Sequence, residues 1–386
     1  MSSRSANTIK FVLLLASTMT VMSGAIIAPG LTSMAADFPD FSEEWIKLVL
    51  AMPALMIGLF AGLIGRISDR YGRIRLLVLC LILYAVAGVS GYFWQQLPWL
   101  LASRAGLGLG VAGIMSLSTS LIGDYFEGEE RKRFMGTHAS VMAFGGMVFL
   151  LLGGYLAELS WRVPFLLYGL GLLVFPIVWS LLPEPDRTPT GKEDTQVTGR
   201  ANQGIVYLIF GVGFSGMTFF YMLPTQLPFL MEETLQIAGR LVGIALAVVT
   251  LTAAISSAFY GRVKSRLSYP MVFVLGFMGM GSGYVLLSLL QTYEGIMAGL
   301  AVAGFGAGFL IPNCNLWLME LTPVEQRGQA IGTLSSMYFF GQFSSPLLVG
   351  LVLPYIGIPL AFRGASILMV LLSLSIGVTF WSRTKR

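Results

Sequence analysis

The sequence predicts an all-α membrane protein with twelve transmembrane helices in two pseudo-symmetric six-helix halves. Three observations support this fold class: a composition too apolar for a water-exposed surface, twelve long uncharged runs, and a repeat of half the chain length. Hydrophobic residues make up 55% of the 386 residues and charged residues only 11%, whereas soluble domains carry about 25% charged residues. A lipid bilayer is therefore the expected surrounding of most of this protein.

The uncharged runs each contain at least 18 residues. A membrane-spanning helix needs ~20 mainly apolar residues, and backbone groups in lipid must be bonded within the segment, so each run predicts a helix. The runs cover 11–36, 48–65, 76–103, 105–123, 134–157, 163–183, 201–231, 241–261, 267–293, 295–319, 328–362 and 364–382.

Lys and Arg are unevenly divided between the two sets of loops. If both termini lie on one side, that side holds 19 of the 24 basic residues and the other side holds Lys47, Arg162, Arg240 and Arg363. By the positive-inside rule, both termini are expected in the cytoplasm, with the protein in the cell (inner) membrane. The sequence has no basic stripe with stacking aromatic residues, so it does not indicate nucleic-acid binding.

An internal repeat appears at an offset of 196 residues. Gly65 then aligns with Gly261, Asp124 with Glu320, and Arg131 with Arg327. Two such halves predict a transporter with its site at their interface. The expected organisation is an N-terminal six-helix bundle at 1–182, a polar cytoplasmic linker at 183–203 and a C-terminal six-helix bundle at 204–386.

The loop between the second and third predicted helices has the sequence GRISDRYGRIR. It resembles the signature of the major facilitator superfamily (MFS) in this loop, Gly-x-x-x-Asp-Arg-x-Gly-Arg. Residues 100–110 and 124–136 are similar to the family's helix-4 motif and 4–5 loop. The resemblance covers the whole chain and implies the MFS fold of a secondary transporter, closest in pattern to the drug:proton antiporter branch. The matching residues of the signature are Gly65, Asp69, Arg70, Gly72 and Arg73.

The resemblance also implies a conformational latch on the cytoplasmic side. In the family pattern Asp69 faces the start of helix 11, and Arg70 or Arg73 pairs with Asp124, which holds the cytoplasmic side closed in the outward-open state. The alternative is that these charges only anchor helix ends at the membrane surface. The predicted latch comprises Gly65, Asp69, Arg70, Gly72, Arg73 and Asp124.

Arg104 is the one basic residue deep within a predicted span. A charge there costs about 3 kcal/mol or more and usually faces a cavity or the bundle interior. Arg104 is therefore either a structural residue bonded to carbonyls of helix 1 or a coupling or substrate-binding cation. Residues 11–36 contain no acid, although proton-coupled drug exporters commonly carry one there. The other coupling or substrate candidates, each near a helix end, are Asp37, His138 and Glu158.

The substrate cavity is expected to draw on helices 1, 4, 7 and 10. Methionine and aromatic side chains make adaptable apolar surfaces, and amides and hydroxyls add polar contacts. Packed or lipid-facing positions are the alternative for each residue. The cavity candidates are Met22, Ser23, Met115, Thr119, Tyr221, Gln226, Asn313, Asn315 and Trp317.

These features predict a secondary active transporter working by alternating access, namely a proton-linked exporter of amphipathic organic compounds such as drugs, siderophore-like metabolites or lipids. A facilitator or proton symporter for a small organic solute is the alternative. The absence of an acid from helix 1 favours it, as does helix 5, where Phe149 and Leu150 replace the antiporter Gly-Pro pair. The expected partners are a small-molecule substrate, protons and the lipid bilayer, with the chain a monomer.

Two other classes of protein fit the sequence less well. One histidine and two isolated cysteines provide neither a nucleophile with its base nor a metal cluster, so we expect no enzymatic activity, no metal and no cofactor. A non-transporting receptor on the same fold would be expected to carry a sizeable soluble domain or tail.

Overall fold

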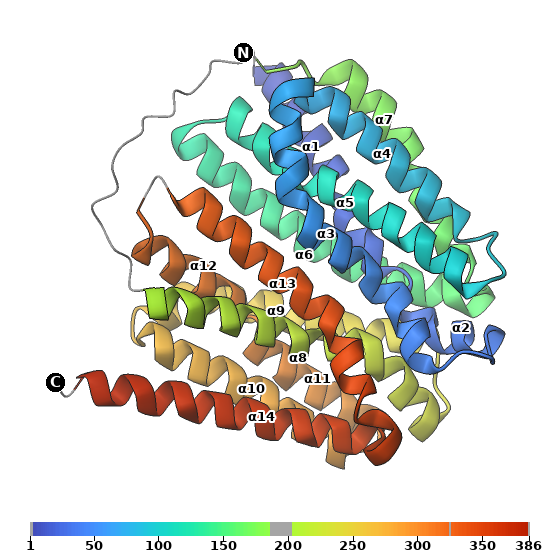
Figure 1. The fold of residues 1–386 in the computed structure, drawn as a ribbon, viewed down its shortest axis with the longest axis vertical. Helices are drawn as coiled ribbons and strands as arrows, with labels where there is room; N and C mark the ends of the chain where they lie inside the picture. Colours follow the sequence, from blue (N-terminus) through green and yellow to red (C-terminus); the bar gives the residue numbers. More distant parts are fainter. Residues whose placement is uncertain (1–2, 186–202, 324–325, 385–386) are drawn as a thin grey trace. The chain divides into compact units, whose positions relative to one another are not determined.

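A computed structural model describes residues 3–185, 203–323 and 326–384 (Figure 1). Most of the predicted linker at 183–203 lies outside these residues. The chain divides into two compact units, one formed by Met1–Ala28 with Ser33–Thr198 and the other by Pro29–Thr32 with Gly199–Arg386.

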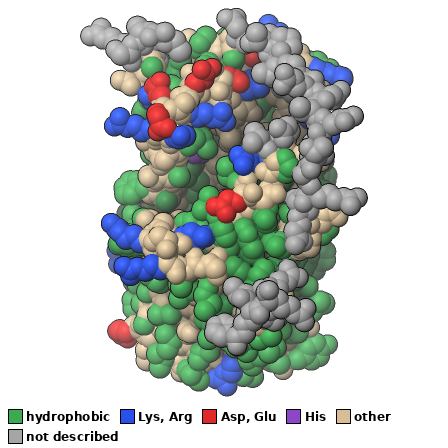
Figure 2. Space-filling view, turned by 90° about the vertical axis from the view of Figure 1, so that its left-hand side faces the viewer, with side chains coloured by type: hydrophobic (Ala, Val, Ile, Leu, Met, Phe, Trp, Pro, Cys, Tyr) green, Lys and Arg blue, Asp and Glu red, His purple; other side chains and the backbone are tan. Residues whose placement is uncertain are grey.

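The predicted fold class is confirmed. Every regular element in the described residues is a helix, and eleven helical segments there are long and apolar enough to cross a membrane. The remaining segment, α13 (Arg327–Gly350), has 24 residues but is rich in Gly, Ser and Gln. This multi-pass chain has broad hydrophobic areas on the face shown in Figure 2, where charged side chains gather in separate clusters.

In the first half, α5 lies in contact with α3 and α4, and α1 packs against α6. The first membrane segment is not one continuous helix, because it passes through a turn and a short 3-10 helix after Ala25. The elements are α1 (Ser3–Ala25), η1 (Ala28–Gly30), α2 (Leu31–Asp37), α3 (Glu43–Tyr71), α4 (Arg73–Ser90), α5 (Leu97–Tyr125), α6 (Gly128–Leu159), η2 (Val163–Gly169) and α7 (Leu170–Leu181).

In the second half, α13 packs along α8, and α10 contacts both α11 and α14 (Figure 1). Arg363, which sequence analysis assigned to a loop, lies within α14 and donates from Nε to the Ser288 hydroxyl at 3.2 Å. The helix therefore begins before Arg363, although the charge of this residue predicted that it lies in a loop. The elements are α8 (Gln203–Leu235), α9 (Arg240–Lys264), α10 (Tyr269–Leu289), α11 (Tyr293–Ala307), α12 (Leu310–Leu321), α13 and α14 (Leu353–Thr384).

The repeat seen in the sequence recurs in the helix packing. A Cβ atom on Gly110 would lie 2.8 Å from the backbone nitrogen of Tyr84, and one on Gly306 would lie 2.3 Å from that of Met280. Both pairs are related by the same offset of 196 residues. The close approach of α4 to α5 is therefore repeated between α10 and α11, and each needs a glycine because a side chain would collide with backbone.

A tyrosine hydroxyl donates to an equivalent backbone carbonyl in each half. Tyr168 donates to the Ser23 carbonyl at 2.8 Å, and Tyr284 donates to the Phe219 carbonyl. The two acceptors are 196 residues apart, but the two tyrosines come from non-equivalent helices. The halves therefore keep the same bond while obtaining the hydroxyl from different places.

Candidate functional site

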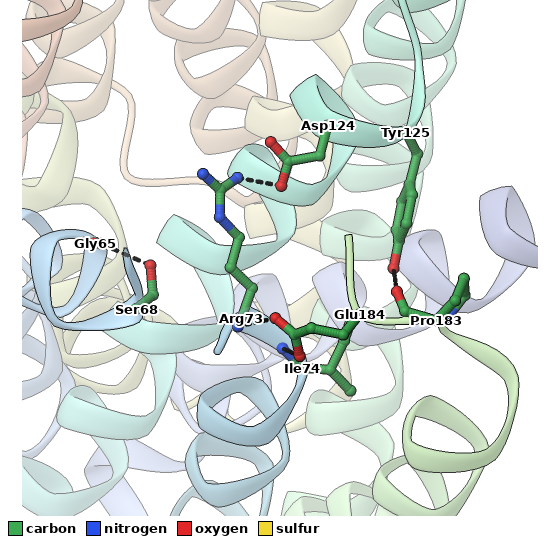
Figure 3. A network of polar contacts seen from close by, with 8 residues as sticks. All are labelled: Gly65, Ser68, Arg73, Ile74, Asp124, Tyr125, Pro183 and Glu184. Carbon is green, nitrogen blue, oxygen red and sulfur yellow. Dashed lines mark hydrogen bonds and ion pairs between the residues drawn. The ribbon is translucent and has the colours of Figure 1, made fainter. Parts of the chain in front are cut away.

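The loop between α3 and α4 makes a tight turn at Gly72, which has φ +98°. Residues with side chains rarely adopt this conformation, so the glycine of the motif is needed for the turn itself. The Gly72 amide donates to the Ser68 carbonyl at 3.1 Å, which ends α3. The Ser68 hydroxyl in turn donates to the Gly65 carbonyl at 2.6 Å (Figure 3). α4 therefore starts at Arg73, immediately after the turn.

Of the two arginines offered by the motif, Arg73 forms an ion pair with Asp124 through Nη1 and Oδ2 (Figure 3). The side chains are 26% and 27% exposed. Asp124 is the penultimate residue of α5, so the pair ties the start of α4 to the end of α5. A partly exposed pair of this kind is worth about 0.2–1 kcal/mol, which suits a contact that forms and breaks.

Glu184 holds the same helix start from a third segment. Its carboxylate accepts from the Arg73 amide at 2.5 Å and from the Ile74 amide at 3.1 Å. These are backbone donors that the first turn of a helix leaves unpaired, and the positive end of the helix dipole favours the carboxylate. Sequence analysis missed this residue because it placed Glu184 in the linker, although an acid just past a membrane helix is a recognisable capping candidate.

The chain beside Glu184 is fixed by a further bond. The Tyr125 hydroxyl donates to the Pro183 carbonyl (Figure 3). The end of α5 therefore binds both the start of α4, through Asp124, and the segment that follows α7, through Tyr125. We define Arg73, Asp124, Tyr125 and Glu184 as the charge cluster.

The other predicted latch residues are placed less completely. Gly65 and Arg70 lie in the last two turns of α3. The side chain of Asp69 lies outside the part of the chain that the structure describes. Its contact with the start of the eleventh predicted span (328–362), which is the start of α13 here, stays a prediction.

Arg104 is fully buried in α5 and binds backbone carbonyls of two other helices. Its Nε donates to the Val49 carbonyl at 3.0 Å and its Nη2 to the Ser23 carbonyl at 2.5 Å. Ser23 lies in the last turn of α1, where carbonyls lack helical partners and the dipole favours a cation. These bonds match the structural interpretation of Arg104.

Part of the Arg104 guanidinium is not accounted for by that role. The guanidinium carbon lies 5.2 Å from the ring centre of Tyr168 and 5.8 Å from that of Phe165. Within the described residues, Nη1 is buried without a hydrogen-bond partner, and no carboxylate pairs with the guanidinium. A desolvated cation with one free donor can also serve electrostatics or coupling.

The other coupling candidates from the sequence lie apart from Arg104. Asp37 accepts from Trp161 Nε1 at 2.8 Å and lies 3.4 Å from Arg162 Nη2, so it ties the end of α2 to the loop before η2. His138 is half-buried on α6, and Glu158 is exposed in the last turn of that helix.

An acid that sequence analysis did not single out lies in α8. One carboxylate oxygen of Glu232, Oε2, is buried and has no hydrogen-bond partner among the described residues. Gln226, two turns earlier and fully buried, leaves both its amide atoms unpaired there as well.

The second half contains a cavity of about 310 Å³ lined by α8, α9, α12, α13 and the end of α11. Three of the cavity candidates from the sequence lie in α12, and of these Asn315 lines the cavity. Asn313 is instead buried, accepting from Tyr260 at 3.1 Å and donating to the Tyr269 carbonyl at 2.9 Å. Trp317 stacks on Tyr269 with ring centres 5.2 Å apart.

The remaining cavity candidates take varied positions in their own halves. Met22 and Ser23 are buried in α1, Met115 is half-buried, and Thr119 is exposed on α5 with its hydroxyl bonded to the Met115 carbonyl at 2.9 Å. Tyr221 is half-buried on α8. These placements do not assign any of them to a substrate.

Comparisons with known proteins place these features in context. A family model described as Major Facilitator Superfamily matches residues 13–232 and 208–386. The multi-drug resistance efflux pump PmrA homolog of Lactococcus lactis subsp. lactis (strain IL1403) is 25% identical over 342 residues, which are 85% of this chain and 83% of that protein. The 3-(3-hydroxy-phenyl)propionate transporter of Escherichia coli (strain K12) is 26% identical over 352 residues, or 86% of this chain and 83% of that one.

A solved structure extends the likeness over the whole length. A bacterial homolog of the human lysosomal transporter Spinster aligns with a TM-score of 0.81 at 16% identity, covering 100% of this chain and 98% of that chain. At this level of identity the likeness shows a shared fold, and leaves the cargo to be argued from the residues.

Proposed function

Because the chain belongs to the Major Facilitator Superfamily and is therefore a transport protein, we propose that it is a proton-linked exporter of amphipathic organic compounds that works by alternating access. It acts in the cell (inner) membrane, as a monomer with both termini in the cytoplasm. Its similarity to a multi-drug efflux pump along 85% of the chain supports export.

The observation that carries the proposal is the charge cluster. Arg73 contacts carboxylates from two other segments, through its side chain to Asp124 and through its amide to Glu184. Contacts of modest energy at the meeting point of three helix ends can stabilise one conformation without preventing the other. This is the property that a latch in an alternating-access cycle requires.

Proton linkage rests on groups that can bind a proton within the membrane segments. Glu232 lies in α8 and has one carboxylate oxygen, Oε2, that is buried without a hydrogen-bond partner among the described residues. We propose Glu232 as the proton-binding residue, ahead of His138, Asp37 and Glu158, with Arg104 supplying fixed positive charge in the other half.

A second function, uptake of a small organic solute by facilitation or proton symport, is favoured by one observation. The chain is 26% identical to a protein named as a 3-(3-hydroxy-phenyl)propionate transporter. The direction in which protons move relative to the substrate distinguishes the two functions.

The experiment uses the purified protein in liposomes with a trapped pH-sensitive dye. Amphipathic drugs, siderophores, aromatic acids and small sugars are added singly. Export coupled to protons predicts substrate-dependent proton movement opposite to the substrate. Movement in the same direction would replace the exporter with the symporter. Substrate flux without any proton movement would remove proton linkage from the proposal.

A further inference from the structure

The cavity of the second half is formed around an interruption of the tenth predicted span (295–319), which the structure divides into α11 and α12. α11 ends at Ala307 and α12 begins at Leu310. Pro312 in the first turn of α12 has no amide hydrogen, so the carbonyl four residues earlier, on Gly308, loses its helical donor. Both Gly308 and Pro312 line the cavity. Interrupted membrane helices are tolerated where they border a cavity rather than lipid.

The lining is uncharged. Its members are mostly aliphatic or aromatic, and none is Asp, Glu, Lys, Arg or His. A charged group entering it would lose hydration without gaining a counter-ion, whereas an apolar group would gain contacts with the lining. The cavity of about 310 Å³ is at the lower end of the range of ligand pockets, ~300–1,000 Å³, so it suits a ring system rather than a whole amphipathic molecule.

One polar feature can orient a ligand. The Tyr338 hydroxyl lies 3.5 Å from Asn315 Oδ1, at the outer limit for a hydrogen bond. The Asn315 amide nitrogen donates to no acceptor in the described part of the chain. The Asn315 amide nitrogen is therefore available to donate to a carbonyl or hydroxyl oxygen on a bound ring, with the Tyr338 hydroxyl beside it.

We propose that this cavity binds the uncharged ring end of the substrate, an aromatic or alicyclic group that carries one hydrogen-bonding oxygen. This inference rests on the proposed function, since it names the part of an amphipathic substrate that the second half recognises. Any charged end of the same substrate must lie outside the cavity.

An introduced thiol in the lining gives a direct test. Ser257 lines the cavity and is exposed, whereas the native Cys80 and Cys314 are both buried and react slowly. The purified full chain carrying Ser257→Cys is treated with N-ethylmaleimide, and alkylation of the introduced thiol is followed by mass spectrometry. Ser282→Cys, at an exposed position on α10 outside the lining, is the control. Three probes share one ring: 2-acetonaphthone is neutral, 2-naphthoate is an anion, and 2-naphthylmethylammonium is a cation.

The neutral ketone is expected to protect the thiol of Ser257→Cys selectively. At about ten times its Kd it fills roughly 90% of the sites, so alkylation of Ser257→Cys slows about tenfold while that of Ser282→Cys is unchanged. Met217→Trp, which adds bulk to the lining, should abolish the protection. Leu275→Trp, at an exposed position on α10 outside the lining, should retain it.

Three results would overturn the inference: no protection by the ketone, equal protection by either charged probe, or equal slowing of Ser282→Cys. The proposed function is tested by a different outcome. Selective protection in a protein that moves no compound across vesicles would leave the cavity assignment standing without export. Coupled transport without protection of Ser257→Cys would leave export standing and remove the cavity assignment.

Discussion

Arg73 and Tyr269 occupy equivalent positions in the two halves, 196 residues apart, each as the first residue of its helix. Arg73 forms an ion pair with Asp124. Tyr269 instead stacks on Trp317, and the Lys264 ammonium lies 3.9 Å from its ring centre. The first half therefore has an exchangeable charge contact at the place where the second half has an aromatic stack, so the proposed latch is expected to act in the first half.

Breaking the Arg73–Asp124 pair should change the rate of transport more than substrate binding. An ion pair with this exposure is worth about 0.2–1 kcal/mol, so Arg73→Gln or Asp124→Asn should shift the conformational equilibrium up to roughly fivefold. Initial rates in proteoliposomes and equilibrium binding measure the two effects. Lys132→Gln is the control, because its pair with Glu129 is largely exposed. Transport at the wild-type rate in both cluster variants would remove the latch from the mechanism.

Removing the Glu184 carboxylate should destabilise the start of α4. Loss of a side-chain cap costs about 0.5–2 kcal/mol, so Glu184→Ala should lower the thermal unfolding temperature in detergent. Glu184→Gln should recover part of the loss, since its amide oxygen can still accept one backbone bond. Glu129→Ala serves as the control. Equal unfolding temperatures for wild type and Glu184→Ala would show that the cap contributes nothing measurable.

Replacing Arg104 by leucine tests whether its role is only structural. Leucine is chosen as the replacement because Leu300 occupies the equivalent position in the second half and is fully buried. Burying leucine avoids the cost of a desolvated cation, which offsets the lost bonds to Val49 and Ser23. Arg104→Leu should therefore remain folded and lose coupled transport. A folded variant with normal coupled flux would restrict Arg104 to a structural role.

Neutralising Glu232 should separate substrate movement from proton movement. Glu232→Gln keeps the shape of the side chain but cannot exchange a proton. We expect the compound to run down its gradient, while the pH dye records no accompanying change. Glu294→Gln, at an exposed acid in the first turn of α11, should behave as wild type. Proton movement retained in Glu232→Gln would transfer the coupling role to another group.

The helical fold was predictable from the sequence because charged residues are costly in lipid, so long uncharged runs mark the membrane helices. The positions of helix ends were predicted less well. Arg363 marks the inside of α14 rather than a loop, since a long cationic side chain can find a polar partner such as Ser288 within a helix.

The candidate site was predictable only in part, for geometric reasons. Grouping Asn313, Asn315 and Trp317 ignored the turn of the helix: at 100° per residue, Asn313 and Trp317 share a face and Asn315 lies on the opposite one. Assigning each residue to a helix face by this rotation separates Asn315 from Asn313 and Trp317. The carbonyl contacts of Arg104 depend on where α1 is interrupted, which no local pattern in the sequence specified.

The most direct test of proton-linked export is transport driven by an imposed proton gradient. Proteoliposomes with an acidic lumen are diluted into neutral buffer, so that an exporter inserted inside-out exchanges luminal protons for external compound. Proton-linked export predicts accumulation of a neutral-ring amphipathic compound above its external concentration in wild type, and only equilibration in Glu232→Gln. Equilibration without accumulation in wild type, with or without the gradient, would contradict proton-linked export.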